Sequence, residues 1–396
     1  MPQRTPGAVK IDVCVGCGGV GKTTVAAALA LQVARSGKRT LVLTIDPAHR
    51  LADALGMAEL GSEPEPIPRA VLTRLGVPAH GSLSALMLDM KRTFDDLVER
   101  FAESADARDR ILGNPIYQHV SDALAGSVEY SAMEKVYELA TSLDFEHIVV
   151  DTPPSQHALD FLEAPQRLLE FLDSRMVHVL IHPAFAAGRF GFRLFHRGTQ
   201  RVLHMIERLS GMGFLEDVSE FLLSIEGMAE GFRTRAESVR RLLLGPDASF
   251  LLVTTPELES ARQALEFLDR LEAFRVPLDT VVANRVRTWP GRGEVPAEGI
   301  ERGTLQGLRD ALAAQEGPDF PAEQAARAAA EAAEGYAALV RRDARALHAL
   351  QIRSVEAGRD WVTIPELPGD VRDLEGLDRI GRCLVARSAG EETVAG

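Results

Sequence analysis

The most constraining feature of the chain is a glycine-rich stretch at residues 16–24, GCGGVGKTT, which directly follows an apolar run at residues 11–15. A strand that ends in glycines can turn its backbone N–H groups around phosphate oxygens, and a helix that begins near Lys22 points the positive end of its dipole at them. The amphipathic segment at residues 25–35 supplies that helix. The stretch therefore predicts a strand, a phosphate-binding loop and a helix, in that order.

Each residue type in the loop has a predicted task. Lys22 would reach the β- and γ-phosphates of a nucleotide, the Thr23 hydroxyl would bind Mg²⁺, and Thr24 is available to the α-phosphate. The backbone of the glycine-rich part would surround the phosphates. The predicted nucleotide-binding residues of the loop are Gly18, Gly19, Val20, Gly21, Lys22, Thr23 and Thr24.

Composition excludes several classes of partner. The chain has 396 residues with a formal net charge of −13, which argues against binding nucleic acid because that would need a basic face. No apolar run approaches the roughly 20 residues of a membrane span, and the N-terminus lacks the apolar core of a signal peptide. We expect a cytoplasmic protein with no integral membrane segment.

The three cysteines, Cys14, Cys17 and Cys383, fit a reducing compartment. Cys14 and Cys17 form a C-x-x-C pattern, but no second pair exists to complete a zinc site, so a core cysteine beside a loop cysteine is favoured. Because Cys17 lies near Lys22 and the start of a helix, we expect a lowered pKa and a reactive thiol.

Short apolar runs rich in β-branched residues alternate with helical patterns along the chain. They lie at residues 40–45, 147–150, 250–254, 280–283 and 361–364, and predict a doubly wound, mainly parallel α/β sheet. Ligands of such sheets bind at the carboxyl ends of the strands. Polar residues follow these runs at Asp46, Asp151, 255–257, Asn284 and 365–366. Asp151 is the predicted carboxylate that holds Mg²⁺, partly through water.

Two long helical segments interrupt the predicted sheet. They span about residues 83–143 and 165–244, and we expect them to build a helical subdomain inserted into a single domain of residues 1–387. Residues 294–350, rich in Ala, Glu and Arg, predict a helical hairpin with Pro321 at a first helical position. Residues 388–396 are expected to form a flexible tail.

Taken together, these motifs resemble the ArsA-type anion-transporting ATPase family of P-loop NTPases, which includes arsenite-pump motors and ATPases that target tail-anchored membrane proteins. The family's motifs are a loop GKGGVGKTT and two switches, DPAHS and DTAPTGH. This chain has GCGGVGKTT, then DPAHR at residues 46–50 and DTPPSQH at residues 151–157. The resemblance continues through residues 126–130, 255–257 and 284–286 to IPELP at residues 364–368, and so covers almost the whole chain.

The resemblance implies an ATPase that uses ATP and Mg²⁺, with Lys22 and Asp46 as catalytic residues. Asp46 would orient or deprotonate the attacking water, in keeping with phosphoryl transfer, which needs positioning and charge compensation. Side chains from two later segments would hold adenine, and His49 and His157 in the two switches could report the γ-phosphate to the helical subdomain. The adenine-binding residues are Asn284, Pro365, Glu366 and Leu367, and the switch residues are His49, Arg50, Pro153 and His157.

A single phosphate loop implies a dimer, since the family closes its active site across two such halves. A homodimer and a heterodimer with a paralogous ATPase both remain open. Large apolar side chains crowd the second insertion and suit either a hydrophobic protein client or the core of the subdomain. They are Phe185, Phe190, Phe192, Phe195, Met205, Met212 and Phe214. With so few thiols, a metalloid pump is disfavoured.

Cys17 departs from the family, which has a lysine there that reaches the phosphates of the other subunit. A cation supplied to the transferring phosphoryl group is worth about 10³–10⁵ in rate, so we expect slow hydrolysis unless another cation, such as Arg50, replaces it. One alternative is a weakly or non-hydrolysing regulatory partner of a paralogous ATPase. Another is a MinD/ParA-like positioning ATPase, which the long helical insertions disfavour.

Overall fold

The computed structural model describes residues 9–45, 50–120, 127–142, 144–153, 170, 223, 229–290, 295–296, 302–316, 320–369, 371 and 373–385. Within this part of the chain, eight strands form one sheet in the order β3-β4-β2-β5-β1-β6-β7-β8. Neighbouring strands run parallel, except for β3 and β4, which pair antiparallel. The predicted doubly wound α/β fold is confirmed.

Each strand predicted from an apolar run is present in the sheet. They are β1 (Lys10–Gly16), β2 (Arg39–Thr44), β5 (His147–Asp151), β6 (Ala248–Thr254), β7 (Leu278–Val286) and β8 (Asp360–Pro365). The sheet also contains β3 (Glu65–Pro66) and β4 (Ser82–Met87), which were not predicted. β1 lies between β5 and β6, with Cys14 opposite Asp151 on one side and Leu251 on the other. The glycine-rich loop therefore leaves the middle of the sheet.

Helices cover both faces of the sheet, because side chains of the central strands alternate between two apolar layers. Ile11 and Val13 belong to one buried cluster and Cys14 to the other. The first layer contains α7 (Ser127–Ser142), α13 (Ala229–Leu243), α14 (Leu258–Ala273) and the last turns of α16 (Ala322–Glu356). The second contains α1 (Lys22–Arg35), α2 (Arg50–Leu55), α3 (Arg69–Arg74) and α17 (Leu374–Val385).

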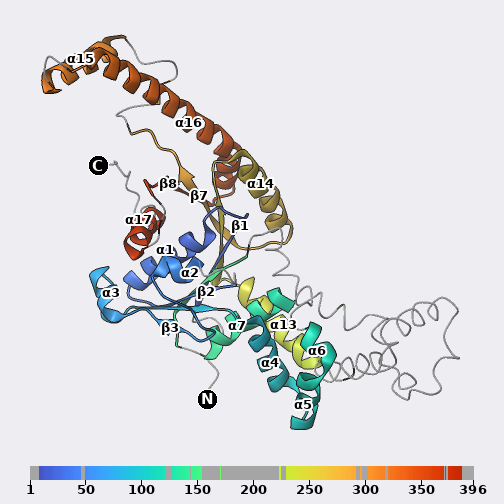
Figure 1. The fold of residues 1–396 in the computed structure, drawn as a ribbon. Helices are drawn as coiled ribbons and strands as arrows, with labels where there is room; N and C mark the ends of the chain where they lie inside the picture. The colour runs from blue at the N-terminus through green and yellow to red at the C-terminus, as the bar shows by residue number, and fades with distance from the viewer. Residues whose placement is uncertain are drawn as a thin grey trace.

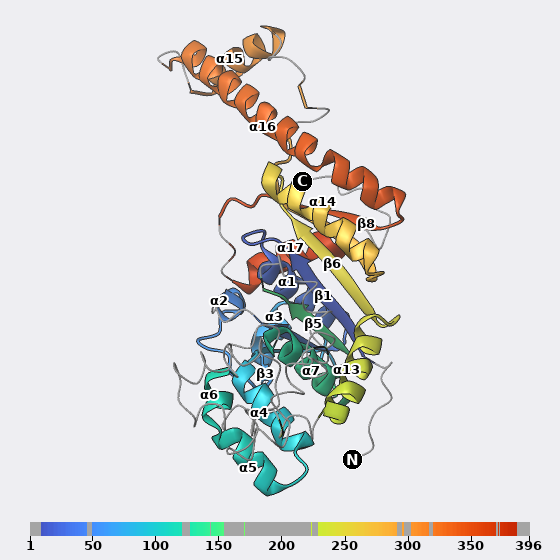
Figure 2. The ribbon, with the colours of Figure 1, turned by 90° about the vertical axis from the view of Figure 1, so that its right-hand side faces the viewer.

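Further helices gather at one end of the molecule, where α4 (Met90–Phe101), α5 (Ala105–Gly113) and α6 (Pro115–Val120) lie beside α7 and α13 (Figures 1 and 2). The predicted start of this insertion at residue 83 is wrong, because residues 82–87 form β4. Leu83, Ala85 and Leu86 are all buried, and the periodicity of such a short apolar run does not separate a strand from a helix. Most of the second predicted insertion, residues 165–244, lies outside the described residues.

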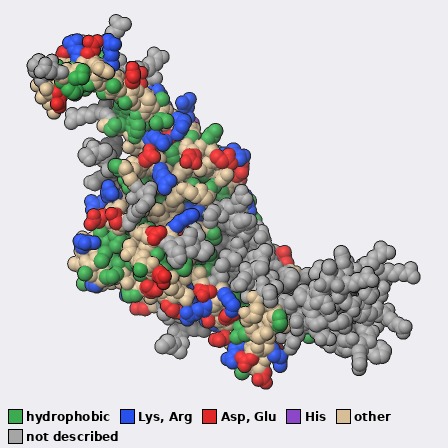
Figure 3. Space-filling view, in the orientation of Figure 1, with side chains coloured by type: hydrophobic (Ala, Val, Ile, Leu, Met, Phe, Trp, Pro, Cys, Tyr) green, Lys and Arg blue, Asp and Glu red, His purple; other side chains and the backbone are tan. Residues whose placement is uncertain are grey.

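A helical hairpin projects from the opposite end of the body, formed by α15 (Arg302–Glu316) and the first half of α16 (Figures 1 and 2). The predicted hairpin is confirmed, and α16 begins directly after Pro321. On the face shown in Figure 3, acidic and basic side chains are interspersed over the body and the hairpin. In the part of the chain that the structure describes, no helix is both long and apolar enough to cross a membrane.

Candidate functional site

The loop between β1 and α1 has the conformation that its glycines permit. Gly16, Gly19 and Gly21 all have positive φ, at 148°, 79° and 92°. α1 begins at Lys22, and the Val25 N–H donates to the carbonyl oxygen of Gly21 at 3.0 Å. The N-terminal turn of α1 thus faces the space enclosed by the loop, as phosphate binding requires.

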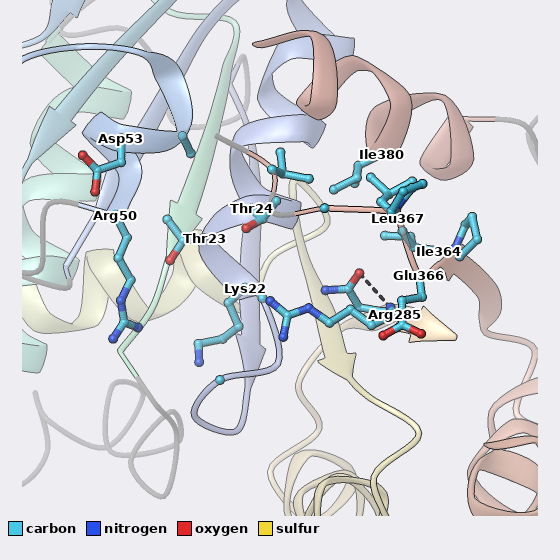
Figure 4. A pocket seen from close by; sticks show the side chains of 18 of the residues that line it. Lys22, Thr23, Thr24, Arg50, Asp53, Arg285, Ile364, Glu366, Leu367 and Ile380 are labelled. Carbon is cyan, nitrogen blue, oxygen red and sulfur yellow. Dashed lines mark hydrogen bonds between the residues drawn. The ribbon is translucent and has the colours of Figure 1, made fainter. Parts of the chain in front are cut away.

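A cavity of about 1160 Å³ opens beside this loop, at the carboxyl ends of the parallel strands (Figure 4). Its walls come from the loop and α1, from α2 and the turn after it, from the end of β7, and from the segment that follows β8. The lining residues from these segments include Gly19, Gly21, Lys22, Thr23, Thr24, Arg50, Asp53, Asn284, Arg285, Pro365, Glu366 and Leu367. Thr152 after β5 and Ile380 of α17 also line the cavity, so segments from many parts of the sequence meet at one site.

Thr23 and Asp151 form the polar base of the site. The Thr23 hydroxyl donates to Oδ2 of Asp151 at 2.8 Å, and the Thr44 hydroxyl at the end of β2 donates to the same oxygen at 2.9 Å. Asp151 is fully buried. A hydroxyl and a carboxylate in contact form the oxygen-rich set that suits Mg²⁺, so these residues fit the predicted metal site.

The Lys22 ammonium group folds back onto the loop and donates to the carbonyl oxygen of Cys17 at 2.8 Å. Burial raises the pKa of the half-buried Cys17 thiol, and the positive charge of Lys22 opposes that shift without overcoming it. The expectation of a lowered Cys17 pKa is therefore wrong. Burial of the thiolate raises its pKa more than the nearby Lys22 charge lowers it.

Asn284 joins the end of β7 to the phosphate loop. Its amide nitrogen donates to the carbonyl oxygen of Val20 at 2.8 Å, and its amide oxygen accepts from the backbone N–H of Arg285 at 3.0 Å. The side chain lies so close to the loop that a Cβ atom at position 21 would overlap its amide nitrogen. Asn284 therefore fixes the loop, and its predicted contact with adenine stays a prediction.

The wall after β8 is anchored by Arg287, the residue directly after β7. Arg287 contacts Glu366 through Nε at 3.2 Å and contacts the fully buried Asp343 of α16 at 3.1 Å. The Glu366 backbone N–H also donates to the carbonyl oxygen of Val286 at 3.0 Å. These contacts hold the segment predicted to bind adenine against the rest of the site.

Of the other predicted residues, Gly18, Val20 and Pro153 are described but do not line the cavity, and neither do residues 255–257. Asp46, His49 and His157 lie outside the described residues. Arg285 and Thr44 were not predicted as site residues. Arg285 directly follows a predicted site residue, and Thr44 nearly ends a predicted strand, so position at a strand end was the available signal for both.

Comparison with known proteins identifies similar sequences across most of the chain. The model of a family described as "Anion-transporting ATPase" matches residues 9–290. The protein named ATPase get3 from Schizosaccharomyces japonicus is 27% identical over 273 residues, covering 68% of this chain and 72% of that protein. The ATPase get3 of Schizosaccharomyces pombe is 24% identical over 272 residues, covering 68% and 71%. A 155-residue match to ATPase GET3 of Malassezia globosa is 31% identical and covers 39% and 42%.

Proposed function

Because this chain belongs to the anion-transporting ATPase family, we propose that it is a Mg²⁺-dependent ATPase that couples ATP binding and hydrolysis to movement of its helical subdomain. We also propose that it works as a dimer on a hydrophobic protein client or one associated with a membrane. The observation that carries the proposal is the hydrogen bond from Thr23 to the buried Asp151, next to a cavity that Thr23 and Lys22 both line.

The residues around the cavity divide the work of phosphoryl transfer. Lys22 and the N-terminal turn of α1 would bind the phosphates, while Thr23 and Asp151 would hold Mg²⁺, whose charge neutralises phosphate oxygens when it is bound. Asp46 would orient the attacking water or accept its proton. Asn284 and the segment at residues 365–367 would hold the adenine.

The link from the site to the helical subdomain follows the chain through α7 into β5. Glu134 on α7 is buried and accepts from the guanidinium of Arg235 on α13 at 2.7 and 2.9 Å, while Arg100 on α4 lies 3.3 Å away. The three helices are thus joined by ionic contacts. Since β5 ends at Asp151, a rearrangement at that carboxylate is directly connected to the end of α7.

The positions of the cysteines argue against a metalloid as the client. Cys14 is buried in β1, Cys17 is in the phosphate loop and Cys383 is on α17. Among the described residues no group of three or more Cys, His, Asp or Glu side chains is placed to hold a metal ion. A soft-metal site would need such a group of thiolates.

Binding is tested by thermal and chemical unfolding with Mg²⁺-ATP. At about 100 times the dissociation constant, the nucleotide should stabilise the fold by roughly 2.7 kcal/mol, and Lys22→Ala should remove most of this gain. Asp46→Asn should abolish turnover yet leave ATP affinity intact. A wild-type protein whose stability is unchanged by Mg²⁺-ATP would refute the proposal.

The second candidate, a weakly hydrolysing regulatory partner of a paralogous ATPase, is favoured by Cys17. Single-turnover hydrolysis by the chain alone and with a paralogue separates the two functions. If the missing cation limits the rate, Cys17→Lys should accelerate the homodimer by about tenfold or more. If the homodimer binds ATP but neither the wild type nor Cys17→Lys hydrolyses it, the result would support the regulatory role.

A further inference from the structure

Three cationic side chains line the nucleotide cavity: Lys22, Arg50 and Arg285. In the view of Figure 4, the guanidinium groups of Arg50 and Arg285 lie on either side of the Lys22 ammonium group. Arg50 comes from the start of α2, and Arg285 comes from the end of β7. Positive charge therefore reaches the cavity from two walls besides that of the phosphate loop.

The backbone of Arg285 is held in a conformation that a non-glycine residue rarely adopts, with φ of 57°. Its N–H donates to the side-chain oxygen of Asn284, and the pairing of β7 with β8 shifts register between Ala283 and Val286. This local irregularity lies where Arg285 lines the cavity while its neighbours Ala283 and Val286 are buried. Asn284 thus fixes both the phosphate loop and the arginine.

The contrast with Arg287, two residues later, shows that Arg285 is not part of the same ionic network. Arg287 contacts two carboxylates, those of Asp343 and Glu366. Arg285 is exposed, and among the described residues no carboxylate forms an ion pair with its side chain. A guanidinium that lines a cavity without a protein counter-ion is suited to a multiply charged anion, because its planar fork donates two parallel hydrogen bonds to phosphate oxygens.

We propose that Arg285 and Arg50 bind the polyphosphate of the nucleotide, so that this chain supplies from its own strand and helix ends the positive charge that Cys17 does not. The inference rests on the proposed function, since it takes ATP as the ligand of this cavity. It adds a preference for nucleoside triphosphates and diphosphates over monophosphates, because the two arginines recognise charge at the phosphates and not the base.

The experiment measures the dissociation constants of Mg²⁺-ATP, Mg²⁺-ADP and AMP for the wild type, for Arg285→Ala, for Arg50→Ala and for the double variant. Arg345→Ala is the matched control, since Arg345 is an exposed arginine on α16 outside the cavity. Each cavity variant should bind Mg²⁺-ATP at least about tenfold more weakly. AMP affinity should change little, and Arg285→Lys should recover part of the ATP affinity because it keeps the charge.

The outcomes separate a phosphate contact from a structural role. An equal loss for ATP and AMP, or a lower melting temperature without nucleotide that Arg285→Lys does not repair, would show that the arginine only supports the fold and would overturn the inference. Wild-type ATP affinity in the double variant would overturn it as well. If the wild type itself binds no nucleotide, the proposed function fails first, and the variants are not needed to show it.

Discussion

Replacing Gly21 with alanine should destabilise the protein even without nucleotide, because the new Cβ has no room. Gly21 has φ of 92°, and an L-residue in the left-handed region costs about 1–2 kcal/mol. The Cβ would also overlap the amide nitrogen of Asn284. Displacing that amide breaks its hydrogen bonds to Val20 and Arg285, each worth about 0.5–1.5 kcal/mol. The expected total is about 2–5 kcal/mol.

Gly19→Ala provides a matched control in the same loop. Gly19 has φ of 79°, but a Cβ built there meets no heavy atom within 4 Å. Only the backbone term then applies, so the cost should be about 1–2 kcal/mol. The difference between the two variants, about 1–3 kcal/mol, isolates the contact between the loop and Asn284.

The assay is urea unfolding of both variants in the wild-type background and in Asn284→Ala, without nucleotide. Removing the Asn284 side chain removes the overlap and the two hydrogen bonds, so Gly21→Ala should then cost no more than Gly19→Ala. Equal costs of the two variants in the wild type would refute the reasoning. So would an unchanged excess cost of Gly21→Ala after Asn284 is removed.

Three further predictions concern titratable groups. At pH 8, Cys17 should react with iodoacetamide more slowly than a free thiol, because burial raises its pKa. Cys14 should react more slowly still, since complete burial and nearby carboxylates raise its pKa well above the ordinary value. Rapid labelling of Cys17, measured by mass spectrometry, would contradict this. Glu134→Ala should lower the free energy of unfolding by about 3–5 kcal/mol, because it removes the buried carboxylate that Arg235 contacts. Glu134→Gln should lower it less, since the amide oxygen still accepts a hydrogen bond. Similar urea midpoints for the two variants would argue against the ionic contact. Burial disfavours ionised Asp378, but contacts with Arg382, Gln32 and Arg35 outweigh it and lower its pKa. Its contribution to stability is therefore present above about pH 4 and lost as the pH falls further. The difference in unfolding free energy between wild type and Asp378→Asn should stay constant from about pH 6 to pH 4 and shrink below about pH 4.

The sequence predicted the sheet because buried parallel strands are short apolar runs bounded by polar residues. β1, β5 and β6 lie within a residue or two of the predicted ranges. β4 was misassigned to a helical insertion because Leu83, Ala85 and Leu86 fit either type of element. Its place beside β2 is fixed by pairing with a strand that is distant in sequence, which local pattern does not encode.

Within the site, the positions of Lys22, Thr23 and Asp151 were predictable because the glycine-rich motif and the end of a predicted strand fix where they lie. The structure adds what depends on three-dimensional placement. Arg285 lines the cavity where a left-handed backbone and a shift in strand register occur, and neither is visible in the sequence. The pKa of Cys17 depends on the balance between burial and the Lys22 charge, and only the fold reveals how far the thiol is buried.

The ion pairs of Arg287 connect the cavity wall to the long helix α16. Arg287 contacts Glu366 in the cavity wall and Asp343 in the second half of α16, while the first residues of the helix lie far out on the projecting hairpin (Figure 2). At 1.5 Å per residue, about 30 Å of helix separates Asp343 from Ala322. If α16 tilted by about 5° about Asp343, Ala322 would move by about 3 Å. Because Asp343 lies close to the cavity wall and α15 packs against the far end of α16, such a tilt would move α15 further than it moves the wall.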